Sequence, residues 1–401
     1  MSPRPADAEA PSIAVVGGCG HVGLPLAVAF SLAGCRVAIV DRSVEAVASV
    51  RAGRVHFMDE GLEAGLARAL EAGLQVGTDP GAVAAAEVVV CVIGTPIDEH
   101  LNPQVDKLFA AVDELLPHLR AGQLFVLRST VFPGATETLA RRLAARVPGV
   151  EVAFCPERVA QGVALREIGA LPQLVSGTTP AARERAAALF ARLAPQTVPL
   201  EPLEAELAKM FCNTWRYIQF AAANQFYALC LAHGLDYYRI LAAITQDYPR
   251  MRSLPGAGFA AGPCLFKDTM QLAAFYNYEF SLGQAAMLVN EGLPRRLVQH
   301  LRQAGLEGKV VGLLGMTFKG DNDDLRDSLA FKLRKLLLVE AREVVCTDEH
   351  ARGAWWRPLE DVLARADLLV VCAPHARYRA LAPRQPVLDP WNVLGRGGLL
   401  A

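Results

Sequence analysis

Residues 13–23 of the chain read IAVVGGCGHVG. An apolar run followed at once by Gly-x-Gly-x-x-Gly, and then by an apolar helical pattern, is typical of the first strand, turn and helix of a dinucleotide-binding domain. In this interpretation Gly18 permits the tight turn, Gly20 lets the backbone approach a pyrophosphate, and Gly23 lets helix and strand pack closely. The helix N-terminus offers its N–H groups and its dipole to the anion. The alternative is a glycine turn that binds nothing.

The residue that ends the next predicted strand favours the first interpretation. Asp41 lies 41 − 23 = 18 residues beyond Gly23, where a carboxylate accepts a hydrogen bond from the adenosine ribose 2′-hydroxyl. A carboxylate there repels a 2′-phosphate, so we predict NAD as the cofactor, although the adjacent Arg42 keeps NADP open. His21, inside the glycine turn, is expected to pack against the cofactor rather than to catalyse.

Short apolar runs alternate with Ala- and Leu-rich helical stretches through about the first 180 residues. The runs are residues 13–16, 36–40, 87–93, 124–128, 152–155 and 173–175. Because they are apolar on both faces, they fit the strands of a parallel sheet that helices cover on both sides. This alternation predicts a doubly wound α/β domain.

The character of the chain changes near residue 202 and changes back near residue 307. Segments 203–233 and 283–304 have helical spacing, and a Gly/Pro-rich irregular stretch, 248–263, lies between them. Strand-like runs return at residues 310–314, 343–346, 368–372 and 387–388. We predict the fold class α/β, with two Rossmann-like parallel-sheet domains bridged by a helical central domain. The predicted parts are a disordered leader at 1–11 and domains at 12–200, 201–306 and 307–401.

The composition argues against several classes of protein. With 40 Lys and Arg against 41 Asp and Glu, the net charge is −1, so the basic surface that nucleic acid or an anionic membrane requires is missing. No apolar run reaches the roughly 20 residues that span a bilayer. The nine cysteines include no C-x-x-C pair, which favours reduced thiols in a cytoplasmic protein. His56, His100 and His375 lack the spacing of metal ligands, so we predict no metal.

A polar stripe runs along the predicted helix at 203–233. Glu206, Lys209, Asn213 and Arg216 recur at spacings of three and four, which places them on one face. The neighbouring positions are large and apolar, so we expect the helix to be buried and the stripe to face a wet cleft. An ordinary solvated stripe is the alternative.

Residues 256–268 read GAGFAAGPCLFKD. Pro263 suits a first helical position, so Cys264 is expected in the first turn of a helix, where the dipole lowers the pKa of a thiol. Lys267 and Asp268 follow at i+3 and i+4, close to that thiol. The pattern leaves open whether Cys264 is a nucleophile or an inert packing thiol. The other eight cysteines are interpreted as packing residues.

In their order along the chain these motifs resemble the UDP-glucose/GDP-mannose dehydrogenase superfamily, the nucleotide-sugar 6-dehydrogenases. The resemblance covers about residues 12–394. Besides the glycine turn and the cysteine loop, the matching stretches are GTP at 94–96, STVFPG at 129–134, PERV at 156–159, AELAK at 205–209 with Asn213, and FKGDNDDLRDS at 318–328.

The resemblance implies an NAD-dependent, four-electron oxidation of a sugar C6 alcohol to a carboxylate, with two NAD per turnover. It implies that Cys264, as a thiolate, attacks the C6 aldehyde, and that the thiohemiacetal is then oxidised to a thioester that water hydrolyses. Lys209 would stabilise the oxyanion, with Asn213 as a supporting donor. Asp268, Thr130 and Glu157 are candidates for holding the water or relaying protons.

Other residues match binding positions of the family. The matched catalytic residues are Cys264, Lys209, Asp268, Thr130, Glu157 and Asn213. The matched cofactor contacts are Gly18, Gly20, His21, Val22, Gly23, Asp41, Arg42, Thr95, Pro96, Thr130, Lys267 and Arg326. The matched substrate contacts are Glu157, Arg158, Val159, Lys209, Asn213, Arg250, Gly258, Phe318 and Lys319. The resemblance also implies nucleotide-sugar binding by domain 307–401 and a homodimer through the middle helices, in which Arg250 reaches the neighbouring subunit's substrate.

The chain departs from the family pattern at several positions. Pro263 stands where a serine usually precedes the nucleophile, and it removes a backbone N–H donor. Cys212 replaces an acidic residue, and Gln161 and Gln225 stand where glutamates are common. The Pro-Glu-Arg-Val motif is closer to the N-acetylhexosamine enzymes, so the substrate is left as a UDP-hexose or a UDP-N-acetylhexosamine. The alternatives are a two-electron alcohol dehydrogenase in which Cys264 is idle, and a non-enzyme that binds NAD and a nucleotide sugar.

Overall fold

The computed structural model of the protein describes residues 10–400, so residues 1–9 of the predicted disordered leader lie outside the described residues. The chain divides into two compact units, one ending at Phe211 and the other beginning at Cys212. The division falls inside α8 (Pro202–Ala232), a helix of 31 residues. The predicted division into three domains, with boundaries at 200 and 306, stays a prediction.

The first unit is built on one sheet, with eight strands among its described residues, in the order β3-β2-β1-β4-β5-β6-β7-β8. The strands are β1 (Ser12–Val16), β2 (Arg36–Val40), β3 (Gln75–Gly77), β4 (Val88–Cys91), β5 (Leu124–Leu127), β6 (Glu151–Phe154), β7 (Gln173–Gly177) and β8 (Thr197–Pro199). Neighbours pair in parallel except β6 and β7, which are antiparallel. The strand order reverses between β1 and β4, the switch point where α/β sheets bind ligands.

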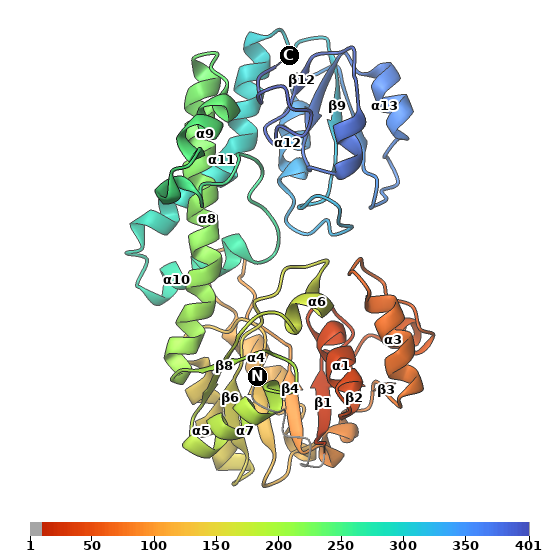
Figure 1. The fold of residues 1–401 in the computed structure, drawn as a ribbon, viewed down its shortest axis with the longest axis vertical. Coiled ribbons are helices and arrows are strands. Elements are labelled where there is room, and N and C mark those ends of the chain that lie inside the picture. Colours follow the sequence, from red (N-terminus) through yellow and green to blue (C-terminus); the bar gives the residue numbers. More distant parts are fainter. Residues whose placement is uncertain (1–9, 401) are drawn as a thin grey trace. The chain divides into compact units, whose positions relative to one another are not determined.

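Helices cover both faces of this sheet (Figure 1). The helices are α1 (Gly23–Leu32), α2 (Val44–Arg51), α3 (Leu62–Glu71), α4 (Val105–Asp113), α5 (Ala135–Arg146), α6 (Ala164–Ile168) and α7 (Pro180–Phe190), with 3-10 turns at Pro80–Ala85 and Leu116–His118. One core packs α1, α3 and α7 against the sheet, around Leu24, Phe30 and Leu66. The other packs α4 and α5 against the opposite face, around Leu108 and Leu143. Burial on both faces explains why the strands are continuously apolar.

The second unit combines helices with a smaller sheet, whose order is β10-β9-β11-β12 and whose pairs are all parallel. Its strands are β9 (Val310–Leu314), β10 (Glu343–Thr347), β11 (Leu368–Val371) and β12 (Val387–Leu388). Besides the C-terminal part of α8, its helices are α9 (Tyr237–Thr245), α10 (Leu265–Phe275), α11 (Ser281–Gln303), α12 (Leu329–Leu337) and α13 (Leu359–Arg365), with 3-10 turns at Pro249–Met251 and Ala376–Ala380. One core joins α8, α11, α12 and the sheet (Figure 1).

Several helices begin at side chains that accept hydrogen bonds from their first turn. The Oγ of Ser43 accepts from the N–H of Ala46 at the start of α2, and Asp236 caps α9 in the same way. Thr179 caps α7, where Pro180 occupies the first helical position. These polar residues fix where α2, α7 and α9 begin.

The predicted fold class is confirmed: along the chain, an α/β sheet, a helical region and a second α/β sheet follow one another. The large sheet differs from the expectation by its one antiparallel pair, β6 with β7. Strands β3 and β8 were not predicted, because each has three residues and lies at an edge of the sheet. Within residues 10–400, no helix is both long and apolar enough to cross a membrane.

Candidate active site

The glycine turn follows β1 in the first unit, and the structure reassigns one of its glycines. The left-handed position is Gly17, with φ +76°, rather than Gly18. Gly18 is needed for packing, because a Cβ there would lie 2.8 Å from the Ile39 side chain. At Gly23 a Cβ would lie 2.5 Å from the Cα of Gly18, which confirms the predicted close packing of helix and turn. A Cβ at Gly20 would meet nothing within 4 Å, so the turn is open there to a pyrophosphate.

Asp41 follows β2 and faces the same turn. Its carboxylate accepts hydrogen bonds from the N–H groups of Cys19 and Ser43, both at 3.0 Å. The side chain is half-buried, whereas Arg42 is exposed. The open face at Gly20 and the adjacent carboxylate therefore fit NAD: the turn would hold the pyrophosphate and Asp41 the ribose.

Two further predicted cofactor contacts lie beside the turn. The ring of His21 packs on Phe57, with centroids 4.1 Å apart, and its Nδ1 lies 3.1 Å from Nε2 of Gln161. Val22 is half-buried and directly precedes α1. Gln161, one of the departures from the family pattern, is thus a neighbour of the glycine turn.

The loops after β4 and β5 meet at the carboxyl edge of the sheet. The N–H of Thr95 donates to the carbonyl of Thr130 at 3.1 Å, and Thr95 is buried. A Cβ at Gly94 would lie 2.9 Å from that carbonyl, so only glycine allows this approach. Pro96 and Thr130 are half-buried. The structure thus brings the predicted GTP and STV motifs together.

Glu157 is buried and held by three donors. One carboxylate oxygen pairs with Arg128, and the other accepts from the N–H groups of Arg158 and Val159 at 2.6 and 2.8 Å. The guanidinium of Arg128 is also buried and donates to the Cys155 carbonyl at 2.9 Å. Sequence reasoning missed Arg128, which ends an apolar strand run and gave no other signal.

The polar stripe on α8 is less exposed to solvent than predicted. Glu206 is 1% exposed and caps α5 in the first unit, accepting from the N–H groups of Gly134 and Thr136 at 2.6 and 2.9 Å. Burial raises the pKa of Glu206, although these donors oppose the rise. Asn213 is buried and Lys209 half-buried, so the expectation of one wet stripe is wrong for Glu206.

In the second unit, Cys264 is the N-cap of α10 rather than a residue of its first turn, because the helix begins at Leu265 and not at Pro263 as predicted. The thiol is exposed, and the carbonyl of Cys264 accepts the N–H of Asp268 at 2.9 Å. Asp268 is fully buried: Asn213 donates to it at 2.6 Å, and the ammonium of Lys267 lies 2.8 Å from its other oxygen. Cys264, Lys267, Asp268 and Asn213 thus lie around one helix N-terminus.

The prediction that the other eight cysteines are packing residues is wrong for one of them. Seven are buried, but Cys212 is exposed. Burial raises the pKa of Cys155 and of Cys346 to about 12, so these thiols stay protonated. Gln225, another departure from the family pattern, is also on the surface of the chain.

The loop before Cys264 contacts the segment that follows β9. Gly262 has φ +95°, and a Cβ there would lie 2.5 Å from the ring of Phe318. Gly258 has φ +146°, and both its N–H and its carbonyl are paired with the side chain of Asn224 at 2.9 Å. Sequence reasoning missed Asn224. Both backbone groups of Gly258 are already hydrogen-bonded. If Gly258 contacts a substrate, its missing side chain would make room for that substrate, and its N–H would not be the donor.

The remaining predicted site residues of the second unit lie on its surface. Lys319 is exposed and follows Phe318. Arg326 is half exposed, and its guanidinium binds the buried carboxylate of Asp324 at 2.5 Å, which raises the pKa of Arg326. Arg250 is exposed, with its guanidinium carbon 5.7 Å from the ring centroid of Tyr248.

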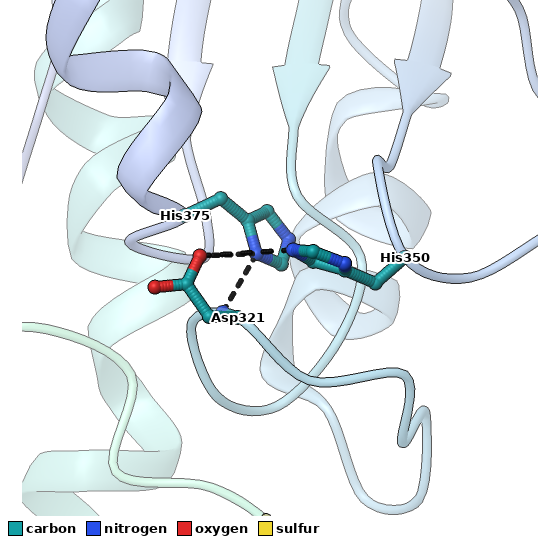
Figure 2. A group of neighbouring side chains, drawn as sticks. All are labelled: Asp321, His350 and His375. Atoms are coloured by element: carbon teal, nitrogen blue, oxygen red, sulfur yellow. Dashed lines mark hydrogen bonds and ion pairs between the residues drawn. The ribbon is translucent and has the colours of Figure 1, made fainter. Parts of the chain in front are cut away.

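Asp321, His350 and His375 come together although their spacing did not predict a metal site (Figure 2). One potential ligand atom from each lies within 4.8 Å of the others. Nδ1 of His375 already accepts the N–H of Asp321 at 2.9 Å, and its Nε2 lies 3.1 Å from the carboxylate of Asp348. These hydrogen bonds explain why the three side chains lie together: His375 holds the turn at Asp321 in place. The predicted absence of a metal stays a prediction.

Comparison with protein families gives three consecutive matches. The NAD binding domain of the UDP-glucose/GDP-mannose dehydrogenase family matches residues 11–194, its central domain residues 203–292, and its UDP binding domain residues 312–396. The matches fall in the order of the predicted domains and take in most of the chain.

Individual proteins are similar over nearly their whole length. The NDP-N-acetyl-D-galactosaminuronic acid dehydrogenase of Ralstonia nicotianae is 28% identical over 94% of this chain and 94% of its own. The UDP-N-acetyl-D-mannosamine dehydrogenase of Pyrococcus horikoshii is 28% identical over 92% of this chain and 90% of its own. Among solved structures, the UDP-glucose dehydrogenase of Pyrobaculum islandicum aligns with a TM-score of 0.91 and 29% identity, covering 98% of this chain and 97% of that one.

The open glycine turn, the Asp41 carboxylate beside it and the three matched domains all agree with a dinucleotide-binding enzyme. The chain belongs to the UDP-glucose/GDP-mannose dehydrogenase family and is an NAD-dependent nucleotide-sugar dehydrogenase.

Proposed function

We propose that this enzyme oxidises the C6 alcohol of a UDP-sugar to the carboxylate, with four electrons removed in all, through a thiohemiacetal and a thioester on Cys264. The observation that carries the proposal is the surroundings of this thiol. Cys264 is exposed at the N-terminus of α10, and one turn later comes a fully buried Asp268 that Asn213 binds at 2.6 Å. Burying a carboxylate is costly unless it is paired, and here Asn213 and Lys267 pair it and fix it one turn from the exposed thiol. A carboxylate held in this way beside a thiol favours a functional role.

Cys264 provides the covalent step. The partial positive charge of a helix N-terminus stabilises a thiolate. The thiolate sulfur forms a bond to the aldehyde carbon, and the carbonyl electron pair moves to oxygen. After the second oxidation, water attacks the thioester carbon, the C–S bond breaks and the thiolate leaves. Bound NAD supplies the hydride acceptor for each oxidation, so two NAD are consumed per sugar.

Lys209 and Asn213 are proposed to stabilise the oxyanion. They lie four residues apart on the continuous helix α8 and so share a face. The Asn213 amide has two N–H groups, of which Asp268 takes one, so the second can reach a developing negative charge. An ammonium on the same face adds a positive charge.

Asp268 and Thr130 are our candidates for holding the hydrolytic water. Glu157 is less suited, because Arg128 and two backbone N–H groups already bind its carboxylate. We assign Glu157 instead to shaping the turn of Arg158 and Val159, which the family resemblance matches to substrate contacts. Lys319, Phe318 and Gly258 are proposed to contact the nucleotide sugar in the second unit.

The sugar is proposed to be a UDP-hexose or a UDP-N-acetylhexosamine. Proteins named as dehydrogenases of UDP-N-acetyl-D-mannosamine and of NDP-N-acetyl-D-galactosaminuronic acid are similar to this chain, which supports the second. The structural likeness to a UDP-glucose dehydrogenase supports the first. A panel of these nucleotide sugars, with NADH formation followed at 340 nm, identifies the substrate.

The stoichiometry of the best substrate tests the mechanism. We expect about two NADH per sugar consumed, and Cys264→Ser should lower carboxylate formation at least about 100-fold, because no thioester can form. The exposed Cys212→Ser is the matched control and should keep its activity. A ratio near one would instead support the two-electron alternative, and undiminished acid formation by Cys264→Ser would reject Cys264 as the nucleophile.

We also propose a homodimer and a reducing compartment. The second unit exposes large apolar side chains on α8 and α9: Trp215, Phe226, Leu229, Ile240 and Ile244. Large apolar side chains exposed on two consecutive helices are typical of an interface. All nine cysteines lie within residues 10–400 and none is in a disulfide, which supports the cytoplasm as the place of action.

A further inference from the structure

The loop that leads to Cys264 is irregular but buried. Between the 3-10 turn at Pro249–Met251 and α10 the chain forms no helix or strand. Yet Ala257, Phe259 and Ala260 are at most 3% exposed. Buried backbone groups outside regular structure need other partners, so the conformation of this loop depends on the side chains that supply them.

Side chains of α8 and α9 supply these partners. The hydroxyl of Tyr237 donates to the Pro255 carbonyl at 3.2 Å. The hydroxyl of Tyr238 is shared between the carbonyls of Ala257, at 3.2 Å, and Pro390, at 2.5 Å. Asn224 binds the backbone of Gly258 at two points, since its Oδ1 accepts the Gly258 N–H and its Nδ2 donates to the Gly258 carbonyl, both at 2.9 Å. Of these three residues, only Asn224 holds both a donor and an acceptor of the loop.

Asn224 is itself held in one orientation. Its Nδ2 also donates to Oδ1 of Asn290 on α11 at 2.9 Å, and Nδ2 of Asn290 donates to the Tyr217 carbonyl at 2.9 Å. Both amides are at most 1% exposed. Turning either amide over would place like groups together, so the chain of bonds admits one arrangement. A buried amide pair between two helices is costly unless every bond is made, and here each side-chain N and O has a partner.

The path from Gly258 to the thiol is short and constrained. A Cβ at Gly258 would lie 2.4 Å from the ring of Trp391. Phe259 and Ala260 are buried, Gly262 contacts the ring of Phe318, and Pro263 has a restricted φ. A shift at Gly258 would therefore pass to both Phe318 and Cys264 rather than being absorbed.

We propose that Asn224, oriented by Asn290, is a positioning residue for nucleotide-sugar binding in this enzyme. It acts through the loop at 256–264 and does not touch the substrate. The inference rests on the proposed function in one respect, namely that this loop faces the nucleotide sugar.

Hydrogen exchange and ligand binding test this on the full chain. In Asn224→Ala we expect faster amide exchange in residues 255–264, and a dissociation constant for UDP-glucose and for UDP raised about 10- to 100-fold, because two hydrogen bonds to the loop are lost. The dissociation constant for NADH should stay within about twofold. Measuring binding in a Cys264→Ser background keeps the readout free of turnover.

Gln219→Ala is the matched control. Gln219 is also an amide on α8, and it donates to the carbonyl of Ser253, just outside the loop, at 2.9 Å. This variant should leave exchange in 255–264 and UDP-glucose binding unchanged. Asn290→Ala is the second variant: it should give a smaller effect of the same kind, and combining it with Asn224→Ala should add little, because Asn290 acts through Asn224.

Unchanged exchange and unchanged UDP-glucose binding in folded Asn224→Ala would overturn the proposal. So would a lowered melting temperature with kcat and KM intact, since that is a purely structural role. If the wild-type chain bound neither UDP-glucose nor UDP, the proposed function would fail, and slower or unchanged exchange in Asn224→Ala would still reject the positioning role independently.

Discussion

Arg128 carries a charge into the interior of the first unit. It is 1% exposed at the end of β5, and its guanidinium donates to the Cys155 carbonyl and to the side chain of Gln173 at 2.9 and 2.6 Å. Since a guanidinium does not give up its proton, its burial requires the carboxylate of Glu157 opposite it. The turn that follows Glu157 is therefore fixed by a buried ion pair.

Removing this arginine should destabilise the first unit. Arg128→Met leaves the Glu157 carboxylate buried without its counter-ion, at an expected loss of about 3–5 kcal/mol in the free energy of unfolding. The four tryptophans all lie beyond residue 211, so circular dichroism in urea reports both units and tryptophan fluorescence reports the second. We expect the first transition by circular dichroism to move to lower urea.

The exposed pair of Arg142 with Asp113, 2.8 Å apart, provides the control. Arg142→Met should cost less than about 1 kcal/mol, because solvent screens an exposed ion pair. Equal losses in the two variants would contradict a special role for burial at Arg128.

At the residue scale, the sequence predicted what motifs encode locally. Asp41 and Cys264 stand next to glycine-rich turns, and the structure places Asp41 directly after β2 and Cys264 directly before α10. Gly18 was predicted to permit the tight turn, but the glycine with positive φ is Gly17, because two adjacent glycines fit the same pattern. Arg128 and Asn224 were missed because their partners lie 29 and 34 residues away in the chain, and no local signal marks such a pairing.

At the scale of elements, Asp348 joins the ends of β9 and β10. Its carboxylate accepts from the N–H groups of Met316 and Thr317 at 2.5 and 3.0 Å, and from those of His350 and Ala351 at 2.9 and 3.0 Å. Burial alone would raise the pKa of Asp348, but the hydrogen bond with His375 and the backbone donors outweigh it and lower the pKa to about 2.

This lowered pKa predicts an acid-sensitive joint between the two strands. A carboxyl group with a folded-state pKa below its ordinary value of 3.8 stabilises the fold above that value and loses its contribution as the pH falls towards 2. Asp348→Asn should therefore lower the stability of the second unit by about 2 kcal/mol at pH 7 and by progressively less between pH 4 and 2.

Tryptophan fluorescence in urea at a series of pH values checks this difference. Asp367→Asn is a suitable control, because Asp367 also accepts a strand N–H, that of Val310, but its side chain is 41% exposed. A stability difference for Asp348→Asn that did not shrink below pH 4 would contradict the assignment.

The elements themselves were predictable where their pattern is long. The helix expected at 203–233 is α8 at Pro202–Ala232, because 31 residues of helical periodicity outweigh any local ambiguity. Strands β3 and β8 have three residues each and lie at the sheet edges, where half of the pairing partners that define a strand are missing. The antiparallel direction of β7 relative to β6 has no signature in composition, because it depends on the path by which the chain returns to the sheet.

At the scale of the whole molecule, the exposed apolar side chains of α8 and α9 predict self-association. Two of these side chains, Leu229 and Phe226, are 58% and 46% exposed and lie three residues apart on one face of α8. Wild-type chain should therefore have twice its chain mass of 43.0 kDa in solution. Phe226→Glu combined with Leu229→Glu should give the single-chain mass, because burying two carboxylates in an apolar contact is unfavourable.

Light scattering on a sizing column measures these masses. Val339→Glu is the control, since Val339 follows α12 and is 86% exposed but lies outside the proposed interface. A wild-type chain of single mass, or a double variant of unchanged double mass, would reject an interface on α8.

The distribution of buried and exposed thiols allows the enzyme to be labelled at a chosen cysteine. Of the nine cysteines, all within the described residues, Cys212 and Cys264 are exposed, and the buried thiol of Cys155 has a pKa raised to about 12. A maleimide dye added under mild conditions therefore has two targets in the folded chain. In Cys212→Ser it has one, so a single fluorophore or crosslinker can be installed at the proposed nucleophile without removing any buried cysteine.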